Sequence, residues 1–206
     1  MAGDEFTPFS GHSRRIFALR FHPSELHLFL TGGWDNSVKA SAAPARAAAP
    51  PPHSPRCLGQ RWALCPLCQV WDKRVPKGAQ SVINGPHICG PGIDIKGEHI
   101  LTASWVPHNA LQLWDLRMSR LWQNVPFPGN PTQGEFLYSA QFCTEDVVVA
   151  GGSGTSGAGI IHTGTGQVIG EVLLSNKPVH AVASASEGQP VAVAGAAGNL
   201  YLAELH

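Results

Sequence analysis

The chain has 206 residues, with 14 basic and 14 acidic side chains, so its formal net charge is zero. Only 14% of the residues are charged, which excludes the basic surplus typical of proteins that bind nucleic acid or a membrane surface. With 23 Gly and 17 Pro among many small aliphatic residues, the composition favours an all-β protein with many tight turns.

The N-terminal region and the cysteines indicate the compartment. The first twenty residues include five charged side chains and no long apolar core, so no signal peptide is expected. No run of about 18 apolar residues occurs anywhere, which predicts no transmembrane helix. Five cysteines, an odd number, do not favour a disulfide framework. We expect a cytoplasmic protein with reduced thiols, with nuclear or cytoskeletal association left open.

Short alternating segments separated by Gly, Pro and Asn turns predict β-strands along the whole chain. In chain order we predict strands at residues 17–23, 29–33, 35–39 continued by 70–72, 93–95, 99–104, 111–115, 138–142, 146–152, 159–161, 179–182, 190–195 and 199–203. Residues 168–172 are predicted to form an outer strand. Residues 6–9 could form another outer strand and complete the last sheet, which would leave no open sheet edge.

The dipeptide Trp-Asp marks a repeat. It occurs as Trp71 and Asp72 and again as Trp114 and Asp115, each time after alternating apolar residues. The two tryptophans lie 43 residues apart, and about 40–45 residues is the period of a propeller blade that carries this dipeptide.

The first unit resembles a WD40 repeat of the WD-repeat β-propeller family. It has Gly11 and His12, then an alternating strand, then a strand that contains Thr31 and Gly32, and it ends in the Trp-Asp dipeptide. The later units are more degenerate, and His162 stands at the Trp position of the third unit. The resemblance implies one domain over residues 1–206 with about four blades, which either close as a ring or belong to a larger propeller.

The resemblance also implies a structural hydrogen-bond network. In this family hydrogen bonds connect a buried His, Ser/Thr, Asp and Trp. The matching positions here are His12, Thr31, Asp35 and Trp71. The resemblance assigns the same structural role to the other Trp-Asp residues, Asp72, Trp114 and Asp115. A catalytic interpretation of this Ser/Thr-His-Asp set is not favoured, because the family buries it.

Residues 40–69 interrupt the first unit. They contain eight Ala, six Pro, three Cys and no acidic residue, a low-complexity composition that predicts a disordered insert. The segment separates residues 35–39 from Val70, where one continuous strand is expected. Its length preserves a reading frame, and its ends can be back-translated into splice-site sequences. We therefore hypothesise that it is retained intron sequence.

The insert also contains the one weak candidate for a metal site. His53, Cys57, Cys65 and Cys68 could supply four zinc ligands, since Cys65 and Cys68 form a C-x-x-C pair. The flanking sequence lacks other features of a zinc module, so a flexible thiol-bearing loop is the preferred interpretation. No cofactor is predicted.

These features favour a non-catalytic protein–protein interaction scaffold. Its partners would be other proteins that bind the propeller faces, not nucleic acid and not a membrane. Trp34 and Trp105 are candidates for the partner-binding surface, and packing between blades is the alternative for both. A second hypothesis is a truncated or intron-retaining isoform that folds poorly and has no independent activity. We find no constellation that predicts an enzyme.

Overall fold

The structure is a computed structural model of the chain. It describes residues 12, 15–25, 27–33, 67–74, 79–128, 133–155, 157–174, 177–185, 190–196 and 198–204. The described residues form fifteen β-strands and no helix. The predicted all-β class is therefore confirmed.

The strands form four antiparallel sheets, each built from strands that are consecutive in the chain. We call these sheets blades 1 to 4. Blade 1 contains β1 (Ile16–Phe21), β2 (Leu28–Gly33), β3 (Leu67–Asp72) and β4 (Ser81–Asn84). Blade 2 contains β5 (Ile93–Lys96), β6 (His99–Ala103), β7 (Leu111–Asp115) and β8 (Arg120–Asn124). Blade 3 contains β9 (Leu137–Phe142), β10 (Val147–Gly152), β11 (Gly157–His162) and β12 (Val168–Leu173), and blade 4 contains β13 (Val179–Ser184), β14 (Val191–Gly195) and β15 (Leu200–Ala203).

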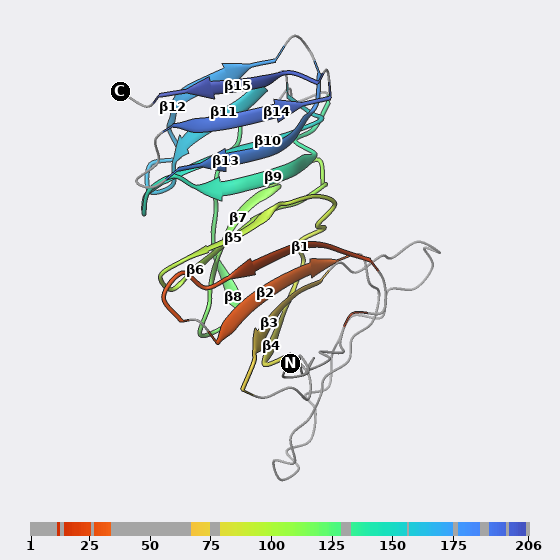
Figure 1. Cartoon of the computed structure of the whole chain (residues 1–206), viewed down its shortest axis with the longest axis vertical. Coiled ribbons are helices and arrows are strands. Elements are labelled where there is room, and N and C mark those ends of the chain that lie inside the picture. The colour runs from red at the N-terminus through yellow and green to blue at the C-terminus, as the bar shows by residue number, and fades with distance from the viewer. Residues whose placement is uncertain are drawn as a thin grey trace, which may run out of the picture.

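The blades follow one another as in a four-blade β-propeller. The first strand of each blade packs beside the first strand of the next, from β1 to β5, β5 to β9 and β9 to β13. Blades 3 and 4 lie at one end of the long axis and blade 1 at the other, with blade 2 between them (Figure 1). The four sheets therefore form an ordered stack in which the first and last blades are far apart.

Three hydrophobic clusters fill the spaces between consecutive blades. Because side chains alternate along a strand, each sheet has two faces, and the middle blades bury both. Blade 2 places Ile93 and Ile100 against blade 1, and Leu101 and Leu111 against blade 3. The third cluster joins blades 3 and 4 and includes Val149, Ile160, Val191 and Val193, and the thiol of Cys143.

The predicted insert contributes residues to blade 1. Leu67, Cys68 and Gln69, the last three residues of the 40–69 segment, form the first half of β3 and pair with β2. Cys68 is fully buried among apolar side chains, and the side chain of Gln69 is buried on the other face. The rest of the insert, and the predicted strand at 35–39 and the predicted outer strand at 6–9, lie outside the described residues.

A hydrogen-bonded seam runs along the first strands of the blades. In blade 2, Asp94 accepts the backbone N–H of Phe142 in blade 3 at 2.9 Å and lies 3.8 Å from the guanidinium of Arg20 in blade 1. In blade 3, Gln141 accepts the N–H of Ser184 in blade 4 at 3.1 Å. Side chains of one blade thus fix the backbone of the next, and Asp94 joins three blades.

The Asp94→Asn variant tests the charge at this seam. Burial raises the pKa of Asp94 above its usual value, although hydrogen bonds and Arg20 oppose the shift. A raised folded-state pKa means that ionisation costs stability as the pH rises from the unfolded-state pKa to the folded-state pKa. Asn keeps the acceptor for Phe142 without a charge. We therefore expect wild type to lose stability relative to the variant as the pH rises through the acidic range.

Urea unfolding of both proteins across this pH range measures the difference in free energy of unfolding. A difference that stays constant with pH would contradict the raised pKa of Asp94. The variant Asp146→Asn changes a carboxylate in an exposed turn of blade 3 and serves as the control.

Candidate functional site

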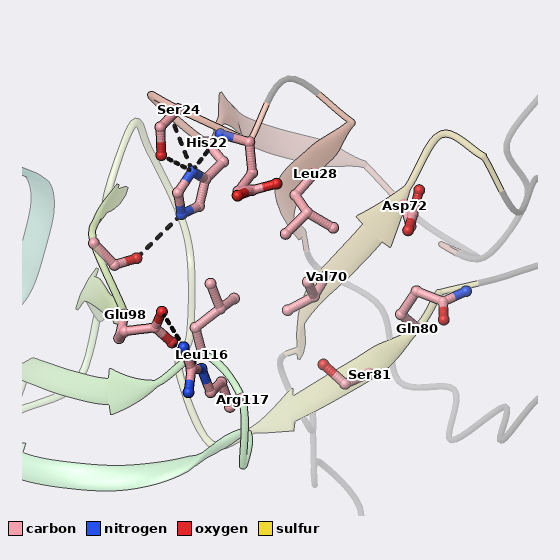
Figure 2. A pocket seen from close by; sticks show the side chains of 12 residues that line it. His22, Ser24, Leu28, Val70, Asp72, Gln80, Ser81, Glu98, Leu116 and Arg117 are labelled. Atoms are coloured by element: carbon pink, nitrogen blue, oxygen red, sulfur yellow. Dashed lines mark hydrogen bonds and ion pairs between the residues drawn. The ribbon is translucent and has the colours of Figure 1, made fainter.

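A pocket of about 530 Å³ opens between blades 1 and 2 (Figure 2). Four turns form the pocket: β1–β2 and β3–β4 of blade 1, and the matching β5–β6 and β7–β8 of blade 2. They meet at one edge of the sheets because the strands of each blade are antiparallel and consecutive. Its floor is apolar, with Leu28, Val70 and Leu116 facing the middle of the pocket. The polar lining consists of His22, Ser24, Glu25, Asp72, Gln80, Ser81, Glu98 and Arg117.

His22 joins the two blades at the pocket wall. Its Nδ1 accepts the backbone N–H groups of Glu25 at 2.9 Å and Ser24 at 3.3 Å. Because Nδ1 is an acceptor, Nε2 carries the proton, and it donates to the carbonyl of Gly97 in blade 2 at 3.1 Å. His22 is buried, so these bonds hold the β1–β2 turn in one position relative to the β5–β6 turn.

Two ion pairs border the pocket. Asp72 accepts a hydrogen bond from Arg74 at 2.6 Å, and this bond lowers the pKa of Asp72 to about 2. On the side of blade 2, Arg117 donates to Glu98 at 2.8 Å, and both side chains are more than half exposed. Glu25 lies 3.5 Å from His27. Carboxylates outnumber cations in the pocket lining, so its electrostatic character favours a cationic or polar ligand group.

Ser24 and His22 do not form a nucleophile–base pair of the hydrolase type. Ser24 Oγ lies 3.3 Å from His22 Nδ1, but that nitrogen already accepts two backbone N–H groups of the same turn. A carboxylate that orients the imidazole is characteristic of catalytic triads, whereas here the other nitrogen contacts a backbone carbonyl. This geometry stabilises a turn.

The structure brings together three of the four residues in the predicted network. The indole N–H of Trp71 donates to Thr31 Oγ1 at 2.6 Å, and His12 Nε2 lies 2.6 Å from the same hydroxyl. The fourth residue, Asp35, lies outside the described residues. In blade 2 the N–H of Trp114 donates to Thr102 at 2.9 Å, so the Trp–Thr bond is repeated.

The Asp residues of both Trp-Asp dipeptides act at the following turns. Asp72 accepts the backbone N–H of Arg74 at 2.9 Å, and Asp115 accepts the backbone N–H of Met118 at 2.7 Å. Each carboxylate thus stabilises the turn into the outer strand of its blade. This hydrogen bonding repeats with the period of the sequence.

Trp105 lies at the opposite edge of the sheets from the pocket. It follows β6, and its ring contacts His87 at 6.2 Å and Phe136 at 5.1 Å between centroids. The Trp105 side chain is 41% exposed, so it combines inter-blade packing with an accessible aromatic surface. The other predicted partner-binding tryptophan, Trp34, lies outside the described residues.

Cys68 packs in the core between blades 1 and 2. Burial raises the pKa of its thiol to about 12, which disfavours the thiolate that zinc requires. His53, Cys57 and Cys65 lie outside the described residues. Among the described residues, no three His, Cys, Asp or Glu side chains are grouped so as to hold a metal ion.

Sequence reasoning did not find the pocket residues His22, Glu98 and Arg117. They lie in turns of two different blades, and nothing in their local sequence marks them. Only the repeat offers a signal, because it aligns the turn after each first strand with the same turn of the next unit.

Comparisons with known proteins bear on the fold. Within the part of the chain that the structure describes, no helix is long and apolar enough to cross a membrane. No family model matches the chain, and no curated protein matches it. A solved structure, the crystal structure of the computationally designed Ika4 protein, is similar with a TM-score of 0.62 and 14% sequence identity, and the match covers 99% of each chain. This similarity supports a β-propeller-like fold and does not identify a propeller family.

Proposed function

We propose that the chain is a non-catalytic interaction scaffold of the WD-repeat type that binds a peptide segment of another protein. The WD-repeat assignment is supported by Trp71 and Trp114, which occupy the same strand position in two blades. Each donates its indole N–H to a Thr of the neighbouring strand. The Asp that follows each Trp stabilises an equivalent turn.

The pocket between blades 1 and 2 carries the proposal of peptide binding. It combines an apolar floor with side chains that are already fixed by hydrogen bonds, a pattern typical of preformed binding sites. A volume of about 530 Å³ lies within the range of ligand pockets, about 300–1,000 Å³, and has room for a few peptide side chains. We propose a ligand with a basic side chain directed to Glu25 and Glu98 and an apolar side chain over Leu28.

Peptide display followed by direct titration tests this function. Peptides selected on the chain are expected to be enriched in a basic residue beside an apolar one. The double variant Glu25→Lys/Glu98→Lys should bind them about tenfold or more weakly, because the two lysines would repel the basic side chain of the peptide. Glu145→Lys is the matched control, since Glu145 is exposed in the equivalent β9–β10 turn of blade 3.

Two outcomes would contradict the proposal. One is a selection that yields no peptide for the folded chain. The other is equal affinity for wild type and the Glu25→Lys/Glu98→Lys variant, which would place the peptide elsewhere.

A further inference from the structure

The outer strand of blade 1 ends at the dipeptide Asn84–Gly85, which is the one Asn-Gly pair in the chain. Asn84 is paired with Leu67 of β3, and both Asn84 and Gly85 are exposed. Among the described strands, β4 lies at the edge of its sheet and has β3 as its one neighbour. Exposed backbone hydrogen bonds at such a strand end open locally at a low free energy. The backbone around Asn84 is therefore more easily rearranged than that of the inner strands.

The side chain of Asn84 and the backbone nitrogen of Gly85 are both available for reaction. Within the described part of the chain, the Asn84 carboxamide has no hydrogen-bond partner, and no residue accepts the backbone N–H of Gly85. Gly85 has no Cβ to crowd its own nitrogen, and its φ of +134° is one that residues with a side chain rarely adopt. When the strand end opens, the Gly85 nitrogen can therefore approach the side-chain carbonyl carbon, Cγ, of Asn84.

Two asparagines of blade 2 show how the fold protects this side chain elsewhere. Asn109 is followed by Ala110, whose buried backbone N–H donates to a carboxylate oxygen of Glu135 at 2.6 Å. Asn124 is followed by Val125, whose buried N–H donates to a backbone carbonyl of β7 at 2.9 Å. At both positions the nitrogen that would attack the asparagine is already held in a hydrogen bond and also belongs to a residue with a Cβ.

We infer that Asn84 is a site of spontaneous deamidation through a cyclic imide formed with Gly85. The Gly85 nitrogen forms a bond to Asn84 Cγ, the bond from Cγ to the amide nitrogen breaks, and the proton of the Gly85 N–H leaves with that nitrogen as ammonia. One water molecule from the solvent then opens the imide. Attack on the side-chain carbonyl leaves aspartate, and attack on the backbone carbonyl leaves isoaspartate, in which the main chain runs through Cβ and Cγ of residue 84.

The isoaspartate product lengthens the connection from blade 1 to blade 2 by one main-chain atom. The chain after Gly85 is held at several points, because Pro86 is buried, His87 donates its N–H to Ser104 at 3.2 Å, and Ile88 is fully buried between the two blades. The extra atom must be accommodated beside these contacts, so isoaspartate weakens the packing of blade 1 on blade 2. Aspartate adds a charge at an exposed position and leaves the length of the connection unchanged.

Peptide mapping by mass spectrometry measures the reaction in the full folded chain during incubation at neutral and mildly alkaline pH. The peptide that contains residue 84 should gain the mass difference between an amide and an acid. It should do so about tenfold or more faster than the peptides of Asn109 and Asn124, where a hydrogen bond must first break. The rate should rise with pH, because the attacking nitrogen reacts after it loses its proton.

Two variants of residue 84 complete the test. Asn84→Gln keeps the carboxamide but would have to form a larger ring, so its peptide should stay unmodified over the same period. Asn84→Asp reproduces the charge of the products without the altered main chain. In urea unfolding, Asn84→Asp should have the midpoint of fresh wild type, whereas the isoaspartate form, separated by chromatography, should unfold at a lower urea concentration.

Three results would overturn the inference. One is an Asn84 that reacts no faster than Asn109 and Asn124, and another is a rate that does not change with pH. The third is a reaction of Asn84 that occurs in the urea-unfolded chain and not in the folded chain, which would show that the fold protects this site as well. An isoaspartate form as stable as Asn84→Asp would contradict the proposed effect on the connection between the blades.

Discussion

Replacing Trp71 or Trp114 with alanine is expected to lower the free energy of unfolding by about 3–5 kcal/mol. Both indoles are buried, at 2% and 6% exposure, and each donates a hydrogen bond to a Thr in the neighbouring strand. Alanine leaves a cavity where the indole packs and removes the N–H from the hydroxyl oxygen. Urea unfolding followed by far-ultraviolet circular dichroism measures the loss.

Trp122→Ala provides a matched control, because the same side chain is removed from an exposed position on β8. Trp122 is 58% exposed, and its ring lies 5.6 Å from that of His99 between centroids, so the expected change is about 0.5 kcal/mol. Equal losses in all three variants would contradict the structural role of the Trp–Thr bonds. A broad, non-cooperative transition in wild type would instead favour the hypothesis of a poorly folding isoform.

Deleting residues 40–69 is expected to stabilise the fold by about 2 kcal/mol. The deletion joins Lys39 to Val70, so residues 37–39 take the strand positions that Leu67, Cys68 and Gln69 now occupy in β3. Val38 then replaces the fully buried Cys68 with another apolar side chain. The connection from β2 to β3 becomes roughly tenfold shorter, which reduces its closure entropy. Thermal and urea unfolding measure the gain.

Two further deletions separate the contribution of the strand from that of loop length. Removing residues 40–66 shortens the connection while β3 keeps its present residues, so the fold should also be stabilised. Removing residues 37–69 deletes both residues 37–39 and residues 67–69, so neither set can pair with residues 31–33 of β2. The free energy of unfolding is expected to fall by about 2–5 kcal/mol. Equal stability of all three deletions would contradict the assignment of Leu67–Gln69 to the blade.

Short apolar segments bounded by turn residues made the inner strands predictable. The predicted strands of blades 2, 3 and 4 match β5 to β7, β9 to β11 and β13 to β15, whether they alternate, as β5 does, or are almost continuously buried, as β10 is. The outer strands β4 and β8 were not predicted. In β8 four of five residues are exposed, so no alternation exists to detect, whereas β12 was predicted from its aliphatic residues.

Residue pairings that depend on the repeat were accessible from the sequence, and those that depend on packing between blades were not. The link between Thr31 and Trp71 follows from matching one unit to a family pattern. The pocket depends on how His22 of one blade meets Gly97 of the next, which no local pattern encodes. The contribution of Cys68 to β3 was also hidden, because composition assigned its segment to disorder while its pairing partners lay in β2 and β4.

The linear order of the blades has a consequence for how stability is distributed. Among the described strands, blades 2 and 3 each pack closely on two neighbouring blades, whereas blades 1 and 4 each pack closely on one, so opening is expected to begin in blades 1 and 4. Cys68 reports on the interface of blades 1 and 2, and Cys143, whose pKa burial raises to about 11, reports on that of blades 3 and 4. Both thiols react only when their interface opens. The alkylation rate of each thiol therefore measures how often its interface opens, so the two rates compare the local stability of the two interfaces.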